Sequence, residues 1–159
     1  MIVDMTTNAT ASVEAPATAE RLRAAGLKVT APRVAVFEAL SSHGAHLDAE
    51  SVFERVRADL PTTSLQAVYG VLGALANAGL LRKIEPAGSP ALYESRIGDN
   101  HHHLACTNCH TVVDVECVVG HAPCLTPSNT DGFTISTAEV TFWGLCGNCQ
   151  RTAASEPEG

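Results

Sequence analysis

Six cysteines occur in this chain of 159 residues, and four of them form two short motifs with the same spacing, CTNC and CGNC. In a C-x-x-C motif a tight turn brings two thiolates to one metal ion, and two such turns complete a tetrahedron around zinc. A zinc ion with four cysteine ligands has no open coordination position and is therefore structural. The sequence predicts such a zinc site at Cys106, Cys109, Cys146 and Cys149.

Two other interpretations of these motifs are a redox-active C-x-x-C and a pair of disulfides. A redox motif of the thioredoxin type needs a helix N-terminus after its first cysteine and has no use for a distant second pair. The N-terminus lacks the basic start and apolar block of a secretory signal, so we expect a cytoplasmic protein with reduced thiols. The spacing therefore favours zinc.

The remaining cysteines, Cys117 and Cys124, show no metal-binding spacing. Free cysteine is among the residue types most often buried, which makes an apolar packing role one interpretation. The other interpretation is a pair of redox thiols that respond to oxidation. The sequence leaves both open.

Three consecutive histidines, His101 to His103, precede the first cysteine pair. Side chains on a strand alternate between its two faces, so His101 and His103 share one face and His102 points the opposite way. Two imidazoles on one face form half of a metal site. The alternative is that the run is only the polar end of a strand.

Three residues elsewhere in the chain are candidates to complete a cation site with His101 and His103. Glu94 lies just before the histidine run, Asp114 lies on the returning strand, and His46 lies in a loop of the N-terminal half. Imidazole and carboxylate ligands without thiolate suit Fe(II), Mn(II) or Zn(II), with selectivity set by geometry. The sequence therefore offers a second metal site of different chemistry.

Apolar residues recur at helical spacing through the first half of the chain, which predicts four helices and then a β-hairpin. The helices are expected over 19–26, from Thr30 to the break at 42–46, from Asp48 to Pro61, and from Thr63 to Gly79, and the hairpin strands over 80–85 and 91–95. The hairpin turn is the segment PAGSP.

Helix starts in this half carry capping residues. Thr30 is a candidate N-cap, and Pro32 is tolerated in the first turn because its missing N–H would be unpaired there. Asp48 is the expected N-cap of the third helix. Thr63 and Gln66 form a candidate capping box for the fourth.

Four helices and a hairpin over residues 18–95 follow the order of a winged helix-turn-helix domain. In that arrangement the helix before the hairpin enters the major groove, and its outward face here carries Gln66 and Tyr69. Lys28 and Arg33 lie at the ends of elements, where they can reach phosphates. The alternative is a small helical domain that binds proteins.

The second half of the chain has a β-rich pattern. Extended runs at 99–117 surround the first cysteine pair, and a long extended run at 133–146 leads to the second. The stretch between them holds two prolines and allows only a short helix. The expected fold class is α+β: a winged helix, then a small α/β domain over 96–151 with an antiparallel sheet and a four-cysteine zinc site, with flexible tails at 1–17 and 152–159.

The net charge of −7 argues against a protein that coats nucleic acid without sequence preference. The acidity is uneven, because residues 20–95 hold eight basic and eight acidic side chains whereas residues 96–159 hold two and seven. The first half is therefore free to face phosphates. We expect no membrane segment, because no stretch approaches the roughly 20 apolar residues that a spanning helix needs.

From about Ala19 to Cys149 the chain resembles the ferric uptake regulator (Fur) family. The resemblance is carried by GLKVTAPRVAVFEAL, AHLDAESVF, QAVYGVLGALANAGLL, HHHLACTNC and GLCGNC. Within the family, DVECVVGHAPCL with its two extra cysteines is most similar to the actinobacterial FurA/CatR-type branch. That branch controls catalase-peroxidase genes in response to peroxide.

The resemblance implies a homodimeric repressor that binds palindromic double-stranded operator DNA and is not an enzyme. It places a structural Zn²⁺ on the four paired cysteines and a regulatory Fe²⁺ or Mn²⁺, with Zn²⁺ or Ni²⁺ as alternatives, between the halves. It also implies a recognition tyrosine at Tyr69 and DNA-facing cations at Lys28 and Arg33. The regulatory ligands that it implies are His46, Glu94, His101, His103 and Asp114.

Two positions depart from the family pattern. Gly70 follows the tyrosine where relatives often carry Arg or Asn, and Ala138 stands where many members have a histidine for a further metal site. That further site is therefore not expected here in its usual form. No small organic ligand is expected.

The regulatory ion would act on a hinge, since binding it favours one angle between the halves and hence one spacing of the two recognition helices. Peroxide would release the repressor by oxidising a histidine ligand, His46 or His101, or alternatively by oxidising cysteines. Two functional alternatives remain: an iron, zinc or nickel uptake regulator of the same family, and a metal-dependent hydrolase that uses the histidine cluster.

Overall fold

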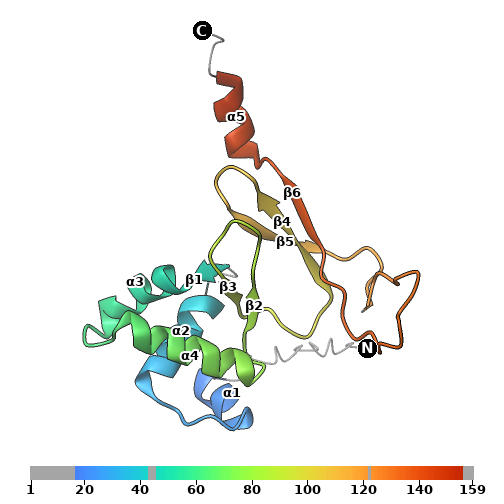
Figure 1. Ribbon diagram of the computed structural model, residues 1–159. Coiled ribbons are helices and arrows are strands. Elements are labelled where there is room, and N and C mark those ends of the chain that lie inside the picture. The colour runs from blue at the N-terminus through green and yellow to red at the C-terminus, as the bar shows by residue number, and fades with distance from the viewer. Residues whose placement is uncertain (1–16, 43–45, 122, 156–159) are drawn as a thin grey trace, which may run out of the picture.

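The computed structural model describes residues 17–42, 46–121 and 123–155 (Figure 1). The chain folds into a helical lobe, which contains α1–α4 and a small sheet, and a C-terminal lobe, which contains a second sheet and α5 (Figure 1). Within those residues, no helix has the length and apolar character needed to cross a membrane.

Four helices form the core of the helical lobe, as the periodicity predicts. They are α1 (Thr18–Ala24), α2 (Ala31–Ser41), α3 (Ala49–Asp59) and α4 (Leu65–Asn77). Each contributes its apolar stripe to one cluster, whose fully buried side chains include Leu22, Val36, Phe37, Leu40, Val52, Val68, Leu72 and Leu75. Burial of such side chains contributes about 1.5–3 kcal/mol each relative to exposure.

The capping expectations are confirmed for α3. The Asp48 side chain accepts a hydrogen bond from the Ser51 backbone N–H at 2.7 Å. Thr30 occupies the N-cap position of α2 with extended backbone but makes no side-chain cap bond. The α2 start therefore depends on Pro32, whose fixed φ suits the first turn.

The predicted capping box of α4 is wrong by one residue. Ser64 is the N-cap, and its hydroxyl accepts from the Ala67 backbone N–H at 3.2 Å. Thr63 instead donates its backbone N–H to the Leu60 carbonyl, so it belongs to the turn that follows α3. Gln66 is consequently left on the exposed surface.

The predicted hairpin is present as β2 (Arg82–Ile84) and β3 (Leu92–Glu94), paired antiparallel. A third strand that the sequence analysis did not anticipate, β1 (Leu47–Asp48), pairs with the other edge of β3. Its register sets Leu47 opposite Tyr93. His46, which directly precedes β1, is thereby carried to the end of β3 where Glu94 lies.

The sheet of the C-terminal lobe has β4 (His101–Cys106) at its centre, with β5 (Val112–Glu116) and β6 (Thr141–Gly144) on either side. The expected antiparallel pairing is confirmed for β4 and β5. It is wrong for β6, which runs parallel to β4. The long connection over 117–140 returns the chain to the end of the sheet at which β4 starts, and this fixes the direction of β6.

The extended run predicted before the second cysteine pair is shorter in the structure than expected. Of the extended run at 133–146, only the four residues of β6 join the sheet. The described residues between β5 and β6 contain no helix, consistent with the prolines and glycines of that stretch. The chain then forms α5 (Gly147–Ser155), which projects from the lobe and continues past residue 151, where the tail was expected to begin (Figure 1).

The substitution Gly70→Ala on α4 should stabilise the protein by about 0.5–1 kcal/mol, because glycine in a helix interior is less favourable than alanine by that amount. A Cβ at Gly70 would meet no atom within 4 Å. Chemical denaturation measures the change. Gly79→Ala is the matched control and should destabilise, since Gly79 has φ of +69° after α4. A destabilised Gly70→Ala variant would contradict this account of the helix.

Candidate metal centres

The four paired cysteines converge at one end of the β4–β6 pair and form what is called here the four-cysteine cluster. Cys106 ends β4, Cys109 lies in the turn to β5, Cys146 follows β6, and Cys149 lies in the first turns of α5. Their sulfur atoms all lie within 4.8 Å of one another, and Cys109 Sγ is 3.7 Å from Cys146 Sγ. The parallel pairing of β4 with β6 thus brings two knuckles, far apart in the chain, into one cluster.

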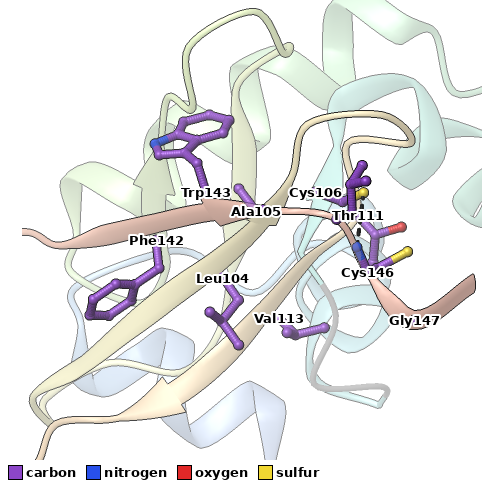
Figure 2. Close-up of a pocket in the computed structure, with 11 residues that line it drawn as sticks. Leu104, Ala105, Cys106, Thr111, Val113, Phe142, Trp143, Cys146 and Gly147 are labelled. Carbon is purple, nitrogen blue, oxygen red and sulfur yellow. Dashed lines mark hydrogen bonds between the residues drawn. The ribbon is translucent and has the colours of Figure 1, made fainter. Parts of the chain in front are cut away.

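All four thiols of this cluster are free rather than joined in disulfides. The Cys146 backbone N–H donates to Cys106 Sγ at 3.4 Å (Figure 2). The backbone N–H groups of Cys109, Cys146 and Asn108 lower the pKa of Cys106 to about 6, which favours its thiolate. The arrangement fits a zinc site.

The pKa of Cys149 is shifted in the opposite direction from that of Cys106, and this shift also fits a zinc site. The Asn108 amide donates to Cys149 Sγ at 3.3 Å, which favours the thiolate, but nearby Cys146 and burial raise the pKa of Cys149 to about 11. Four adjacent sulfurs cannot all carry negative charge without a counter-ion. A bound Zn²⁺ would remove that repulsion and hold all four as thiolates.

A second cluster lies between the two lobes. His46 Nε2 is 2.9 Å from Glu94 Oε2 and 3.0 Å from Asp114 Oδ1. His103 Nε2 is 3.6 Å from Glu94 Oε1 and 3.7 Å from Asp114 Oδ1. His101 Nε2 is 3.2 Å from Glu94 Oε2 and 3.7 Å from Asp114 Oδ1. The structure therefore brings together all five residues that the sequence analysis singled out for this site.

Each of these side chains reaches the cluster for a local reason. His46 and Glu94 belong to the helical lobe, where the β1–β3 pairing aligns them. His101 and His103 share one face of β4 by strand alternation, and Asp114 lies directly opposite His103 on β5. The cluster therefore joins two lobes that are otherwise separate in sequence.

The cluster is short of hydrogen bonds for its degree of burial. His46 Nε2, His103 Nε2 and Asp114 Oδ1 are buried and lie close to other polar atoms, but none of the three has a partner in hydrogen-bond geometry among the described residues. Buried polar atoms are nearly always paired, so three unpaired atoms that face one point indicate a binding site for a ligand. A divalent cation bound by imidazole nitrogen and carboxylate oxygen fits this donor set.

Glu94 supplies the permanent negative charge of the cluster. The residue is only 2% exposed, and burial by itself would raise its pKa. The neighbouring imidazoles of His103 and His46 outweigh burial and hold the pKa of Glu94 far below its usual range. The carboxylate therefore remains ionised and ready to bind a cation at any physiological pH.

Two residues outside the predicted set orient the ligands. Asp99 Oδ1 lies 2.8 Å from His101 Nδ1, which leaves Nε2 of that ring facing the cluster. Arg96 contacts Asp99 at 2.6 Å and Asp114 Oδ2 at 3.3 Å, which leaves Asp114 Oδ1 facing the same point. Neither residue was predicted from the sequence, although Asp99 lies two residues before His101, at the spacing of one strand face.

A third cluster was not predicted as a unit. His102 points away from His101 and His103, as strand alternation predicts, and its Nε2 lies 3.3 Å from Cys124 Sγ. Cys117 joins them, and the three candidate ligand atoms lie within 4.8 Å of one another. The sequence does not link the two thiols to His102, because the segment that joins them carries no periodic pattern.

The predicted DNA-contacting residues lie on the surface of the helical lobe. Tyr69 is 48% exposed on α4, and Gln66 is exposed one turn before it. Lys28 is exposed, and Arg33 is half-buried because its guanidinium donates to the Lys28 carbonyl at 2.9 Å. This bond fixes the segment between α1 and α2, so Arg33 has a structural role beside any contact with phosphate.

The chain is similar in sequence to known regulators. The chain is 56% identical over 144 residues to the transcriptional regulator FurA of Mycobacterium tuberculosis, with 89% of this chain and 97% of that protein covered. It is 50% identical over 122 residues to ferric uptake regulation protein 1 of Mycolicibacterium fortuitum, with 77% and 75% covered.

Solved structures show the same fold. The ferric uptake regulator of Helicobacter pylori matches with a TM-score of 0.64 at 20% identity, over 88% of this chain and 90% of that one. The regulator of Pseudomonas aeruginosa, solved with manganese, matches with a TM-score of 0.60 at 25% identity, over 82% and 98%. The sequence model of the ferric uptake regulator family matches residues 24–142. The chain therefore belongs to the ferric uptake regulator family.

Proposed function

We propose that this protein is a metal-dependent transcriptional repressor that binds palindromic operator DNA as a homodimer. The observation that carries the proposal is the cluster between the lobes, in which His46 and Glu94 of the helical lobe meet His103 and Asp114 of the C-terminal lobe within 4.8 Å. A cation bound there holds the helical lobe at one angle. The names of the relatives, FurA and ferric uptake regulation protein, support the regulatory role.

The helical lobe supplies the DNA-reading surface in this proposal. The outward face of α4 presents Tyr69 and Gln66, and Gly70 leaves the helix surface open to close approach. Lys28 and Arg33 lie beside the start of α2, where they can contact phosphates. A helix in the major groove reads base edges, and cations at the element ends fix its register.

A second copy of the chain is the proposed occupant of the apolar surface of the C-terminal lobe. Leu104, Val113 and Phe142 lie side by side across the three strands, by the register of the sheet, and project from the same face (Figure 2). They are 44–50% exposed, which is unusual for three adjacent large apolar side chains. Pairing of this surface about a twofold axis would bury it and set two α4 helices apart by a fixed distance.

The cluster between the lobes is then the switch. Two states of the hinge differ in how the ligands of the two lobes are placed, and a cation shifts the balance only by its differential affinity for them. Fe²⁺ or Mn²⁺ suits the imidazole and carboxylate donors, and Zn²⁺ or Ni²⁺ uses the same ligand types. Regulators of iron, zinc or nickel uptake are therefore the alternatives within the family.

Release by peroxide completes the proposal, with a catalase or catalase-peroxidase gene as the target. Fe²⁺, when bound, would supply the electrons that reduce peroxide beside the ligand imidazoles. His46 and His101 lie on opposite lobes, so oxidation of either ring removes a ligand from one side of the hinge. The rival trigger is oxidation of thiols, either those of the four-cysteine cluster or Cys117 with Cys124.

The variant His46→Ala tests the switch. It should lower the affinity of the regulatory metal by roughly tenfold or more and abolish metal-dependent binding to an operator duplex selected from random DNA with the native protein. Fluorescence anisotropy with added Mn²⁺ measures this. His110→Asn is the control, since His110 is exposed and its φ of 59° suits asparagine. Unchanged metal-dependent binding in His46→Ala would refute the proposal.

Peroxide treatment of the Fe²⁺-loaded protein should add one oxygen atom to a peptide that contains His46 or His101. Peptide mass spectrometry detects the product, and Mn²⁺-loaded protein is the control, because Mn²⁺ does not reduce peroxide in this way. A new disulfide with loss of zinc, and unmodified histidines, would support the rival trigger and rule out histidine oxidation.

The variant Cys109→Ser should lose the structural zinc and, with it, the dimer. Binding of structural zinc contributes free energy on the order of 10 kcal/mol in small domains, so the C-terminal lobe should unfold at a lower temperature. Metal analysis, sedimentation and thermal denaturation measure these effects. Retention of zinc and of the dimer in Cys109→Ser would show that the four sulfurs do not form one site.

A further inference from the structure

His102 is a buried histidine that neither the four-cysteine cluster nor the cluster between the lobes uses. Its side chain is on the opposite face of β4 from His101 and His103, and the residue is only 7% exposed. Nδ1 has no hydrogen-bond partner among the residues that the structure describes, and Nε2 faces Cys124 Sγ at 3.3 Å. A buried imidazole whose Nε2 faces a thiol is an arrangement in which one metal ion can bind the nitrogen and the sulfur together.

We propose that His102, Cys117 and Cys124 form a third metal site, which binds Zn²⁺. Their candidate ligand atoms all lie within 4.8 Å of one another. The proposal is independent of DNA binding and of the ion between the lobes, although it uses the two thiols that were named above as a rival trigger.

The sheet places Cys117 beside His102 by simple register. Val115 lies directly opposite His102 on β5, and Cys117 follows two residues later, at the spacing that keeps a side chain on the same face. Cys124, seven residues after Cys117, also lies beside the histidine, with Sγ 3.3 Å from His102 Nε2. The Asn100 side chain donates to the His121 carbonyl at 2.7 Å and so ties the segment between the two cysteines to the start of β4.

The backbone around Cys117 resembles that around Cys106 of the four-cysteine cluster. The Cys106 sulfur accepts from the backbone N–H groups of Asn108 and Cys109, which lie two and three residues further along the chain. The Cys117 sulfur accepts from the backbone N–H groups of Val119 and Gly120, at the same two offsets. N–H groups at these offsets lower the pKa of the Cys117 thiol against the opposing effect of burial, which favours the thiolate that a metal ion binds.

The donor set determines which ion is preferred. Two thiolates and one imidazole favour zinc over the harder ions Mn²⁺ and Mg²⁺, and three protein ligands leave a fourth position for water or another ligand. The cluster between the lobes has no sulfur and favours a different group of ions. The two faces of β4 thus carry different donor atoms and favour different metal ions.

The full-length protein is the material for the test, with His46→Ala as the background so that metal binding between the lobes is weakened. Zinc bound per chain is counted by native mass spectrometry after exposure to one concentration of free Zn²⁺. We expect two Zn²⁺ ions in this background and one when Cys117→Ser and Cys124→Ser are added. Replacing His102 by alanine should weaken the second Zn²⁺ at least tenfold.

Cobalt gives an independent readout that does not depend on stoichiometry. Co²⁺ in the third site should show thiolate charge-transfer absorption that the Cys117→Ser variant reduces, with the zinc of the four-cysteine cluster left in place. Val115→Ala is the matched control, because Val115 lies on the same sheet face opposite His102 and offers no ligand.

Two results would overturn the proposal. One is equal zinc content with and without the two thiols. The other is loss of the second Zn²⁺ on Asp114→Asn but not on His102→Ala, which would locate that ion between the lobes.

Discussion

The structure depends on a group of polar atoms that are buried between two lobes without hydrogen bonds of their own. His46 Nε2, His103 Nε2 and Asp114 Oδ1 face one point and have no hydrogen-bond partner among the described residues. Each such atom costs about 1–3 kcal/mol when it is left unpaired. One cation would satisfy all of them at once, and it would do so only when the lobes are correctly placed. The free-energy cost of these unpaired buried atoms is therefore the physical reason that metal binding and the orientation of the lobes are coupled.

Strand β4 organises the chemistry around this point. Its period of two sends His101 and His103 to one face and His102 to the other, while its C-terminal end carries Cys106. Each of the three clusters thus takes at least one ligand from the six residues of β4. One combines nitrogen with oxygen, another sulfur with nitrogen, and the last has sulfur alone. Because ligand type governs ion preference, one strand can hold different ions without a large enclosed cavity.

Much of the fold and of the site could be predicted from local spacing. The C-x-x-C pairs, the four helices, the Asp48 cap and the opposed faces of the histidine run depend on residues within a few positions of one another. Turn geometry and strand or helix period fix such relationships. The capping box at Thr63 was wrong because Thr63 and Ser64 are equivalent as cap residues, and only the turn after α3 distinguishes them.

The sequence by itself determined which side chains could bind metal and on which face of a strand each would lie. The tertiary structure decided how these side chains meet and added Cys117 and Cys124 to His102. The parallel pairing of β6 unites the two cysteine knuckles, the strand β1 brings His46 to Glu94, and Cys124, after β5, lies beside His102. Such contacts join residues that are distant in the chain, and they depend on the path of loops, which carry no periodic signal from which that path could be predicted.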